Sequence, residues 1–563
     1  MLRRKSVLAF LLVSILAKAD DKTMGKPAPV PAPASPSSRW TLVGWNDLGM
    51  HCMDGKDYSI YSILPPFNTI HAQMVDSAGK LVTSTAGISV TYEAVADAAG
   101  SINRTAAGKT NFWNYALPLL GAKLAPDVGL AGFAMPGTGN KPQAMRFDSP
   151  FRWFTAEGVP ITPFDDAGVK NYYPMMRLVA RNSSGAMLAK TDIVLPVSDE
   201  LDCRTCHASG SPNSARPSAG WSFLSDAERD YKTNIVRLHD DRHRGSPAYQ
   251  NALLAKGFNA TGLEATIGGG RPILCAGCHG SNALPGTGVT GISPLTRAVH
   301  SRHAQVLDPV TNLPLDAVEN RSACYRCHPG SETKCLRGAM GAATASNGSM
   351  LMQCQSCHGG MAAVGNASRT GWLQQPSCQN CHTGTALRNN GQIRYTTALD
   401  VNGLPRTALD PTFATNLNTP AAGLDLYRFS KGHGGVQCEA CHGSTHAEYP
   451  SSHASDNVQS VQLQGHSGVL AECSACHAKE PSTIAGGPHG MHTIGQNWVS
   501  RHGDATERGG AAQCRACHGS DYRGTVLSRV QAARVFNAGD FGTRQFAKGT
   551  VIGCYSCHRG PNP

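Results

Sequence analysis

The sequence predicts a multidomain protein. An N-terminal all-β, sandwich-like domain is expected over residues 40–200, followed by a loop-rich domain of mostly short helices over residues 201–563. Two observations predict this division. Seventeen of the 36 aromatic residues lie between Trp40 and Tyr173, among strand-like patterns, and the motif C-x-x-C-H occurs nine times, always after residue 200. The copies are unevenly spaced, which argues against a simple repeat array.

The first 39 residues indicate targeting and linking segments. A basic start precedes an apolar core over residues 6–16, and Ala17-Lys18-Ala19 fits a cleavage site, so residues 1–19 are expected to be a secretory signal peptide. The Pro/Ala-rich residues 20–39 are expected to form an extended linker. No later stretch is long and apolar enough to predict a transmembrane span. We therefore expect an exported protein, in the periplasm, on the outer surface or outside the cell.

Strand-like patterns organise residues 40–200. Residues 88–92 alternate between apolar and polar side chains, as in a half-buried strand. Residues 70–83 are expected to form a hairpin about the turn at 76–79, and residues 177–197 another about the turn at 182–185. Because this part contains no C-x-x-C-H motif, we expect its core to be built from its aromatic residues.

The nine C-x-x-C-H motifs predict covalently bound haem. In each copy two thiols lie on one helical turn, where they can form thioethers to the vinyl groups of one haem, and the next histidine can bind the iron. The cysteines are Cys203, Cys206, Cys275, Cys278, Cys324, Cys327, Cys354, Cys357, Cys378, Cys381, Cys438, Cys441, Cys473, Cys476, Cys514, Cys517, Cys554 and Cys557. The histidines are His207, His279, His328, His358, His382, His442, His477, His518 and His558. A zinc site needs paired C-x-x-C motifs without a fixed histidine, and a thioredoxin-like pair would occur once, so the pattern predicts nine c-type haems (haem c, iron).

These haems are expected to form much of the core after residue 200. The region has 363 residues, about 40 per haem, and a compact domain of that size has a radius of gyration of about 21 Å, so the haems must lie in near contact. We expect that the region does not fold without haem. The wide gap over residues 383–436 predicts a seam between a first block of five motifs and a second block of four.

The second axial ligand decides what each iron can do. Two protein ligands favour electron transfer, whereas an open position admits a substrate. Of the 13 histidines outside the motifs, we expect ten to be second ligands: His239, His243, His300, His303, His433, His446, His466, His489, His492 and His502. His453 is expected to be spare. The members of the pairs at 239/243, 300/303 and 489/492 share a helix face, so each member can serve a different haem.

The first block has one local histidine too few. It has five motifs and four loose histidines, with none over residues 304–432, whereas the second block has seven for four motifs. Three explanations remain: a second-block histidine crosses the seam, His51 or His71 reaches in from the β-rich part, or one haem has a methionine or no second ligand. We favour the crossing, which would also lock the blocks together. The candidate methionines, which packing explains equally well, are Met340, Met350, Met352 and Met361.

Cys52 and Cys335 are the two cysteines outside the motifs. In an exported protein such a pair usually forms a disulfide, which here would close a loop of nearly 300 residues and contribute about 5 kcal/mol. The alternative is that Cys335 touches a haem edge. Cys52 also belongs to His51-Cys52-Met53, which could bind a metal, although a structural turn is the favoured interpretation.

The formal charge of +11 does not predict a nucleic-acid-binding protein. Loss of residues 1–19 removes four basic residues and leaves +7. Each ferric haem with two histidine ligands then adds about −1, because two propionates outweigh the charge of the ring. The basic residues are therefore expected to pair with propionates, and no nucleic-acid partner is expected.

With these motifs, residues 201–563 resemble the large multihaem c-type cytochromes that metal-reducing bacteria export. The segments that carry the resemblance are Cys324-Tyr325-Arg326-Cys327-His328-Pro329-Gly330, Cys354-Gln355-Ser356-Cys357-His358-Gly359-Gly360 and Cys514-Arg515-Ala516-Cys517-His518-Gly519. The resemblance implies low-potential haems with two histidine ligands and electron exchange with other cytochromes or extracellular electron acceptors. Some relatives polymerise, which makes a haem-lined filament, or nanowire, a candidate assembly. Residues 40–200 have no counterpart in this resemblance.

An electron-transfer protein, with electrons hopping along the haems, is the favoured function. The alternative is an enzyme, such as a multihaem nitrite, hydroxylamine or tetrathionate oxidoreductase. The resemblance to those enzymes implies one haem with an open position or a lysine ligand, often on a variant motif. All nine motifs here end in histidine, which favours electron transfer.

Overall fold

The computed structural model describes residues 40–369 and 427–560, apart from residues 86, 202, 282, 345–346 and 482–486. It also describes two short strands, β13 (Ala414–Asn416) and β14 (Thr419–Pro420). The predicted signal peptide, the predicted linker, the motif at 378–382 and most of the predicted seam lie outside the described residues.

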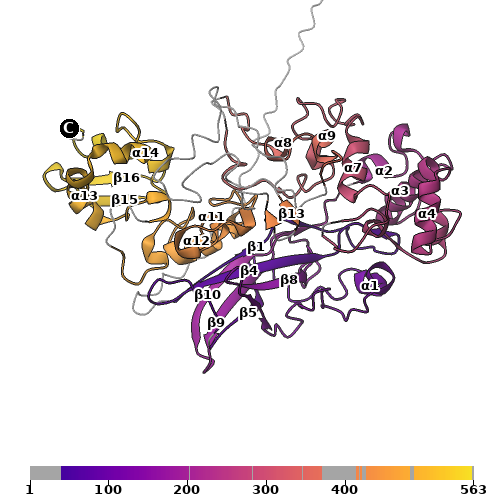
Figure 1. Cartoon of the computed structure of the whole chain (residues 1–563), viewed down its shortest axis with the longest axis horizontal. Helices are drawn as coiled ribbons and strands as arrows, with labels where there is room; N and C mark the ends of the chain where they lie inside the picture. Colours follow the sequence, from indigo (N-terminus) through magenta and orange to yellow (C-terminus); the bar gives the residue numbers. More distant parts are fainter. Residues whose placement is uncertain are drawn as a thin grey trace, which may run out of the picture.

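Two four-stranded antiparallel sheets form the N-terminal region (Figure 1). The first has the order β1 (Thr41–Asn46), β4 (Phe67–Val75), β8 (Trp153–Pro160), β7 (Arg146–Asp148). The second has the order β10 (Met187–Val194), β9 (Met175–Asn182), β5 (Ile88–Val95), β6 (Gln143–Ala144). Helix α1 (Phe112–Leu120) lies outside the sheets. The sheets share one buried cluster, which includes Leu42, Ile70, Met74, Val90, Met176, Leu178 and Ile193.

The strand patterns in the sequence are confirmed. In β5, Val90, Tyr92 and Ala94 are buried between less buried neighbours, as the alternation predicts. Strands β9 and β10 form the predicted hairpin, with Met187 opposite Arg181 beside the turn. The turn after β4 returns only to an isolated bridge between Val75 and Leu81, so that hairpin is shorter than expected.

The aromatic core that the sequence predicted is found only in part: the core between the sheets is not aromatic, but a smaller cluster of the β-rich part buries Tyr58 and Phe112. The cluster between the sheets is mainly aliphatic and methionine-rich, with Tyr92 and Phe154 as its buried aromatic residues. Strand β1 is buried at all six positions because successive side chains point to opposite faces and both faces are covered. Leu42 faces the second sheet, whereas Trp45 joins Trp153 in a separate cluster with residues 436–476. Much of the aromatic surface therefore packs against the motif-bearing region.

Two short parallel strand pairs involve the β-rich part: one joins two of its own segments, and the other joins it to the motif-bearing region. Strand β2 (His51–Cys52) pairs with β11 (Val197–Ser198), and β3 (Tyr61–Ser62) pairs with β12 (Ile273–Leu274). Strand β12 runs directly into the motif at Cys275, so the second ladder fixes the start of that motif against the N-terminal region.

Most helices after residue 200 are short. They are α2 (Arg204–His207), α3 (Ala227–His243), α4 (Pro247–Lys256), α5 (Leu263–Gly268), α6 (Cys275–Cys278), α7 (Leu295–His303), α8 (Cys354–His358), α9 (Met361–Val364), α11 (Cys438–His442), α12 (Val458–Gln464), α13 (Gln496–Gly509) and α14 (Arg515–His518). A small antiparallel pair, β15 (Arg534–Asn537) and β16 (Thr543–Phe546), lies near the C-terminus.

Helix α3 is longer than the sequence analysis anticipated, at 17 residues. The Asp226 side chain accepts hydrogen bonds from the backbone N–H groups of Glu228 and Arg229 and so caps the first turn. Acidic residues in the first turn and Arg242 and His243 in the last turn also suit the helix dipole. Local capping thus extends a helix that the glycine- and proline-rich composition of the region does not suggest.

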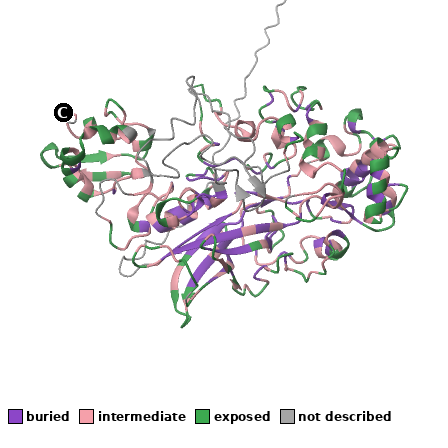
Figure 2. Cartoon of the chain, in the orientation of Figure 1, coloured by how far each residue is buried: buried purple, intermediate pink, exposed green. Residues whose placement is uncertain are grey.

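The motif-bearing region spreads as an arc over the β-sheets, from α3 and α4 at one end to α13 and α14 at the other (Figure 1). Burial is concentrated in the sheets and where they meet the arc (Figure 2). Gly44 N–H donates to Gln459 Oε1 at 2.7 Å, Gln437 N–H donates to Gln73 Oε1 at 2.8 Å, and Arg428 binds Asp47 at 2.7 Å. Although burial opposes ionisation, Arg428 and His71 hold the pKa of Asp47 below its usual range.

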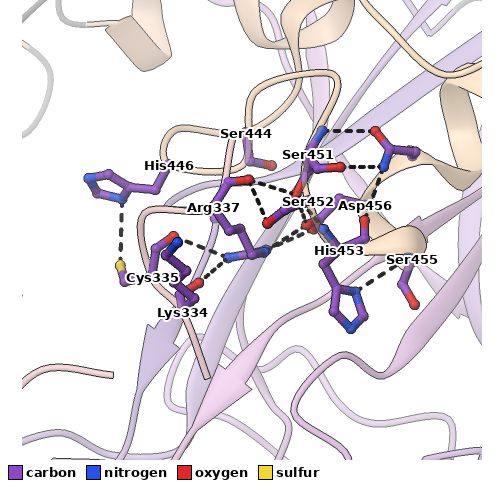
Figure 3. A network of polar contacts seen from close by, with 12 residues as sticks. Lys334, Cys335, Arg337, Ser444, His446, Ser451, Ser452, His453, Ser455 and Asp456 are labelled. Carbon is purple, nitrogen blue, oxygen red and sulfur yellow. Dashed lines mark hydrogen bonds and ion pairs between the residues drawn. The ribbon is translucent and has the colours of Figure 1, made fainter. Parts of the chain in front are cut away.

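A buried ion pair joins the two blocks of motifs (Figure 3). The Arg337 guanidinium donates twice to the Asp456 carboxylate, with both distances at 2.7 Å, and the side chains are 1% and 2% exposed. Ser451 Oγ also donates to Asp456 at 2.6 Å. The backbone N–H groups of Arg337 and Gly338 both donate to the His446 carbonyl, at 2.8 and 2.7 Å. Segment 334–338 is therefore held rigidly against segment 446–456.

We expect Arg337→Ala to lower the free energy of unfolding by about 3–5 kcal/mol, because it leaves the Asp456 carboxylate buried without its partner. The double replacement Arg337→Met with Asp456→Leu removes both charges and should restore most of that loss. Chemical denaturation of the holoprotein, followed by far-UV circular dichroism, measures both values.

The control is the exposed pair of Arg508 and Asp504, whose side chains are 70% and 62% exposed. Arg508→Ala should change the free energy of unfolding by less than about 1 kcal/mol. An equal loss in Arg508→Ala and Arg337→Ala would contradict the assignment of a special role to the buried pair.

Candidate functional site

Each described C-x-x-C-H motif lies on a single helical turn. The histidine backbone N–H donates to the carbonyl of the first cysteine in several copies, at 3.0 Å from His207 to Cys203 and 2.8 Å from His477 to Cys473. This turn puts both thiols and the imidazole of a motif on neighbouring positions. Gly359, Gly443 and Gly519 follow three of the motifs with φ between +77° and +86°, and so end those helices in a conformation that favours glycine.

Among the described residues, seven motif histidines each face a histidine from outside the motifs. The ring centroids lie 5.9–6.4 Å apart in every case. The pairs are His207–His303 at 6.4 Å, His279–His239 at 6.2 Å, His328–His300 at 6.2 Å, His358–His446 at 6.1 Å, His477–His433 at 6.1 Å, His518–His492 at 6.2 Å and His558–His502 at 5.9 Å. The same distance between ring centroids recurs in seven pairs whose surroundings differ, which indicates that the pairs have the same role.

Backbone carbonyls fix the orientation of many of these imidazoles. The Nδ1 atom lies 2.7–2.9 Å from a carbonyl oxygen in His279, His300, His303, His492, His502, His518 and His558. An Nδ1–H that donates to a carbonyl sets the tautomer and leaves Nε2 with a lone pair, which is the state that binds a metal.

Burial keeps several of the facing imidazoles neutral. Burial, assisted by neighbouring imidazoles, lowers the pKa of His358 to about 3 and the pKa of His239 to about 4. The Nδ1 atoms of His207 and His239 are buried without a hydrogen-bond partner. Neutral imidazoles enclosed in this way suit metal ligation and do not suit surface charge.

One connected cavity of about 3,480 Å³ runs through the motif-bearing region. Its lining includes the cysteines and histidine of six motifs, those that begin at Cys203, Cys275, Cys324, Cys354, Cys438 and Cys473, and Cys517 of a seventh. Typical ligand pockets measure about 300–1,000 Å³, so this cavity is several times larger than a site for one ligand. Leu48, His51, Cys52, His71 and Trp153 of the β-rich part form one of its walls.

Neighbouring motifs approach one another closely. Cys324 and Cys354, from the third and fourth motifs, interact through a thiol hydrogen bond that strongly perturbs the pKa of both. Cys203 and Cys275 pack against one shared apolar cluster, and Ala440 and Ala475 belong to another. Three pairs of motifs that follow one another in sequence therefore also lie side by side in space: those at Cys203 and Cys275, at Cys324 and Cys354, and at Cys438 and Cys473.

Other histidines predicted as ligands have different surroundings. His466 has both ring nitrogens near oxygens, with Nδ1 3.0 Å from the Ser467 carbonyl and Nε2 3.1 Å from Glu472. His243 lies beside His239, at 4.7 Å between ring centroids. His489 has a described backbone only, and His382 lies outside the described residues. His442 lines the cavity.

His453, which we expected to be spare, and the two histidines of the β-rich part, His51 and His71, make contacts of other kinds. His453 stacks on Tyr173 at 3.5 Å, and its Nδ1 accepts from Ser455 N–H, which agrees with a structural role. His71 stacks on Trp153 at 4.0 Å, with Nε2 3.5 Å from Asp47. His51 has Nε2 3.1 Å from the Pro65 carbonyl. The β-rich part thus contributes walls to the cavity, and neither of its histidines faces a described motif histidine.

His446 crosses from the second block to the first. It follows the motif at Cys438 in sequence, yet its ring faces His358 of the fourth motif. His433 likewise lies just before Cys438 but faces His477. His300 and His303, three residues apart on α7, face His328 and His207, as expected for residues that serve different motifs. Proximity in sequence is therefore a poor guide to these pairs, whereas the i, i+3 spacing is a good one.

The predicted disulfide between Cys52 and Cys335 is absent, since both are free thiols in this structure. The two are close enough that the charge of Cys335 contributes, after burial, to a raised pKa of Cys52. Cys335 Sγ lies 3.8 Å from His446 Nδ1. Met53 is fully buried in the core between the sheets, so His51-Cys52-Met53 does not converge on a metal. Within the described residues no group of three or more His, Cys, Asp or Glu side chains has the arrangement of a metal site formed by protein alone.

The carbonyls and the arginine that lie beside these motif and partner histidines could not be predicted from the sequence. Leu48 O lies 3.3 Å from His446 Nδ1, and Arg369 donates to the His358 carbonyl at 2.7 Å. No local sequence signal marks a backbone carbonyl as an acceptor, because every residue has one.

No protein-family model and no curated protein matches the chain. In the part of the chain that the structure describes, no helix combines the length and the apolar character that a membrane crossing requires.

Gly365→Ala should destabilise the protein by about 1–3 kcal/mol. A Cβ at Gly365 would lie 2.5 Å from the Ser301 backbone nitrogen, so α9 could no longer pack closely against α7, which carries His300 and His303. Gly245→Ala is the matched control, because a Cβ there meets nothing within 4 Å. Denaturant unfolding of both variants checks the expectation, and equal stabilities would refute it.

Proposed function

We propose that this chain is a nine-haem c-type cytochrome that carries electrons along closely spaced haems with two histidine ligands. The observation that carries the proposal is the set of seven facing histidine pairs, each with one member from a C-x-x-C-H motif. The motifs supply a covalent attachment and one axial ligand, and the facing histidines supply the second.

The residues present fit haem. Two bonds of about 2 Å between a metal and imidazole nitrogens, together with the distances from the ring centres to those nitrogens, add up to about 6 Å, which matches the pairs. A cavity large enough for several ligands lies beside the thiols that would form the thioethers. Two imidazoles without a third protein ligand also suit a metal whose other positions a porphyrin fills, in agreement with the lack of a protein-only metal site among the described residues.

The histidine pairs favour electron transfer over catalysis. Each bound haem would supply one iron that accepts and releases a single electron. An imidazole on both sides would leave no position for a substrate, and Nδ1 contacts to carbonyls hold both rings of the pairs His518–His492 and His558–His502 in place. All seven facing pairs have this form, which favours a carrier over an oxidoreductase of the nitrite, hydroxylamine or tetrathionate type.

The β-rich part would then serve as a platform. Its first sheet covers the motifs at Cys438 and Cys473 through Trp45 and Trp153, and the ladder of β3 with β12 anchors the motif at Cys275. By contacting both blocks, it would hold the row of haems at fixed spacing. We further propose that the protein works after export and exchanges electrons with other cytochromes or extracellular acceptors, either singly or as a subunit of a filament.

Two measurements on the purified holoprotein test this function. The mass of the secreted chain should exceed that of the polypeptide by nine haems, and electron paramagnetic resonance (EPR) should show low-spin ferric iron. His446→Ala should then turn about one ninth of the iron to the high-spin form, because it removes the ring that faces His358.

His453→Ala is the matched control, because His453 comes from the same segment but stacks on Tyr173. It should leave the EPR spectrum unchanged. A secreted protein without the mass of the haems would refute the proposed function, and so would a high-spin signal of the same size in both variants.

We also expect the apoprotein, made without haem attachment, to lose the fold of residues 201–563 while residues 40–200 keep their sheets. The reason is that the sheets share their own aliphatic core, whereas the motif-bearing region surrounds a large cavity. Limited proteolysis followed by mass spectrometry should leave a fragment near residues 40–200. Equal resistance of the two regions would contradict this expectation.

A further inference from the structure

His446 is the imidazole at which three parts of the chain meet. It belongs to the second block, its ring faces His358 of the first block, and its Nδ1 lies near Leu48 O of the β-rich part and near Cys335 Sγ of the first block. No other facing histidine with a described Nδ1 contact has acceptors from two distant segments.

The contacts of His446 Nδ1 differ in kind from those of the other pairs. Elsewhere the carbonyl acceptor lies 2.7–2.9 Å away, whereas Leu48 O lies 3.3 Å from His446 Nδ1. The Cys335 sulfur, at 3.8 Å, is within the reach of a hydrogen bond to sulfur. At His446, a longer contact to a carbonyl oxygen and a contact to a polarisable thiol sulfur thus take the place of the single short carbonyl contact that many of the other facing histidines have.

The surrounding structure holds Cys335 and His446 in register. His446 has φ of +69°, a region that non-glycine residues rarely adopt, so its conformation must be imposed by its contacts. The His446 carbonyl accepts from Arg337 and Gly338, and its N–H donates to Glu448 at 2.7 Å. The ion pair of Arg337 with Asp456 anchors segment 334–338, which contains Cys335 (Figure 3). These backbone contacts therefore hold the Cys335 Sγ atom close to the His446 Nδ1 atom.

We propose that Cys335 is a positioning residue that tunes the redox potential of the haem held between His358 and His446, by accepting the Nδ1–H of His446 through its sulfur. This inference rests on the proposed function. An acceptor at Nδ1–H increases the electron donation of the imidazole and so stabilises the oxidised metal. The thiol adds to the weak contact of Leu48 O and lowers the potential of this one haem. The free state of Cys335 leaves the sulfur available for this contact.

Cys335→Ala in the holoprotein is the decisive variant. Potentiometric titration monitored by EPR should show one low-spin component of the nine moving to higher potential, with altered g values, while the others keep theirs. Cys335→Ser, whose oxygen sits on a shorter bond, should restore at most part of the wild-type potential. A purely structural role for Cys335 would not move a single component in this way.

Cys52→Ala is the matched control, because Cys52 is, like Cys335, a half-buried thiol beside the cavity, and the two lie close together. It should leave every potential unchanged. Unchanged potentials in Cys335→Ala would overturn the inference, as would an equal shift in Cys52→Ala. Haem counting by mass separates the two levels: fewer than nine haems in the wild-type protein refutes the proposed function, whereas nine haems with unmoved potentials refutes only the role of Cys335.

Discussion

The facing of two imidazoles across about 6 Å is the constraint on which the arrangement after residue 200 depends. Two such rings have no attraction for each other at that separation, and burial away from water costs each of them free energy. The part of the chain that the structure describes nevertheless has seven such pairs, with partners that come from helices, loops and opposite blocks. The short helices, the carbonyls at Nδ1 and the glycines that end the motif turns all serve to hold these rings in place.

The β-sheets solve a different problem. A region with a cavity of about 3,480 Å³ and mostly one-turn helices has little regular structure with which to define its own shape. Strand β1, buried on both faces, gives one face to an aliphatic core and the other to the second block. Polar contacts such as Asp47 with Arg428 and Gln73 with Gln437 then fix the position of that block. The β-rich part thus has its own core, and the motif-bearing region packs against it.

Local patterns in the sequence predicted local structure well. The alternation in residues 88–92 and the turn at 182–185 correctly indicated a strand and a hairpin, and the i, i+3 spacing of His300 and His303 correctly indicated two different partners. Partners distant in sequence could not be predicted individually, because only the folded chain decides that His446 faces His358 and that His433 faces His477. The position of Trp45 and Trp153 could not be predicted for the same reason. Both are apolar enough for a core, but the alternation along a strand does not show which of its faces another part of the chain will cover.

The crossing of His446 also has a consequence for biogenesis. Residue 446 follows His358 by 88 positions, so under the proposed function Cys354 and Cys357 would emerge during export well before the ring that would complete their site. Over that interval the thiols would be exposed together with Cys324, their close neighbour in the fold, and wrong sulfur–sulfur bonds would compete with haem attachment. Under the proposed function, a cell that makes this protein would therefore need to keep the thiols reduced until each has bound its haem, because His446 can face His358 only after that later part of the chain has arrived.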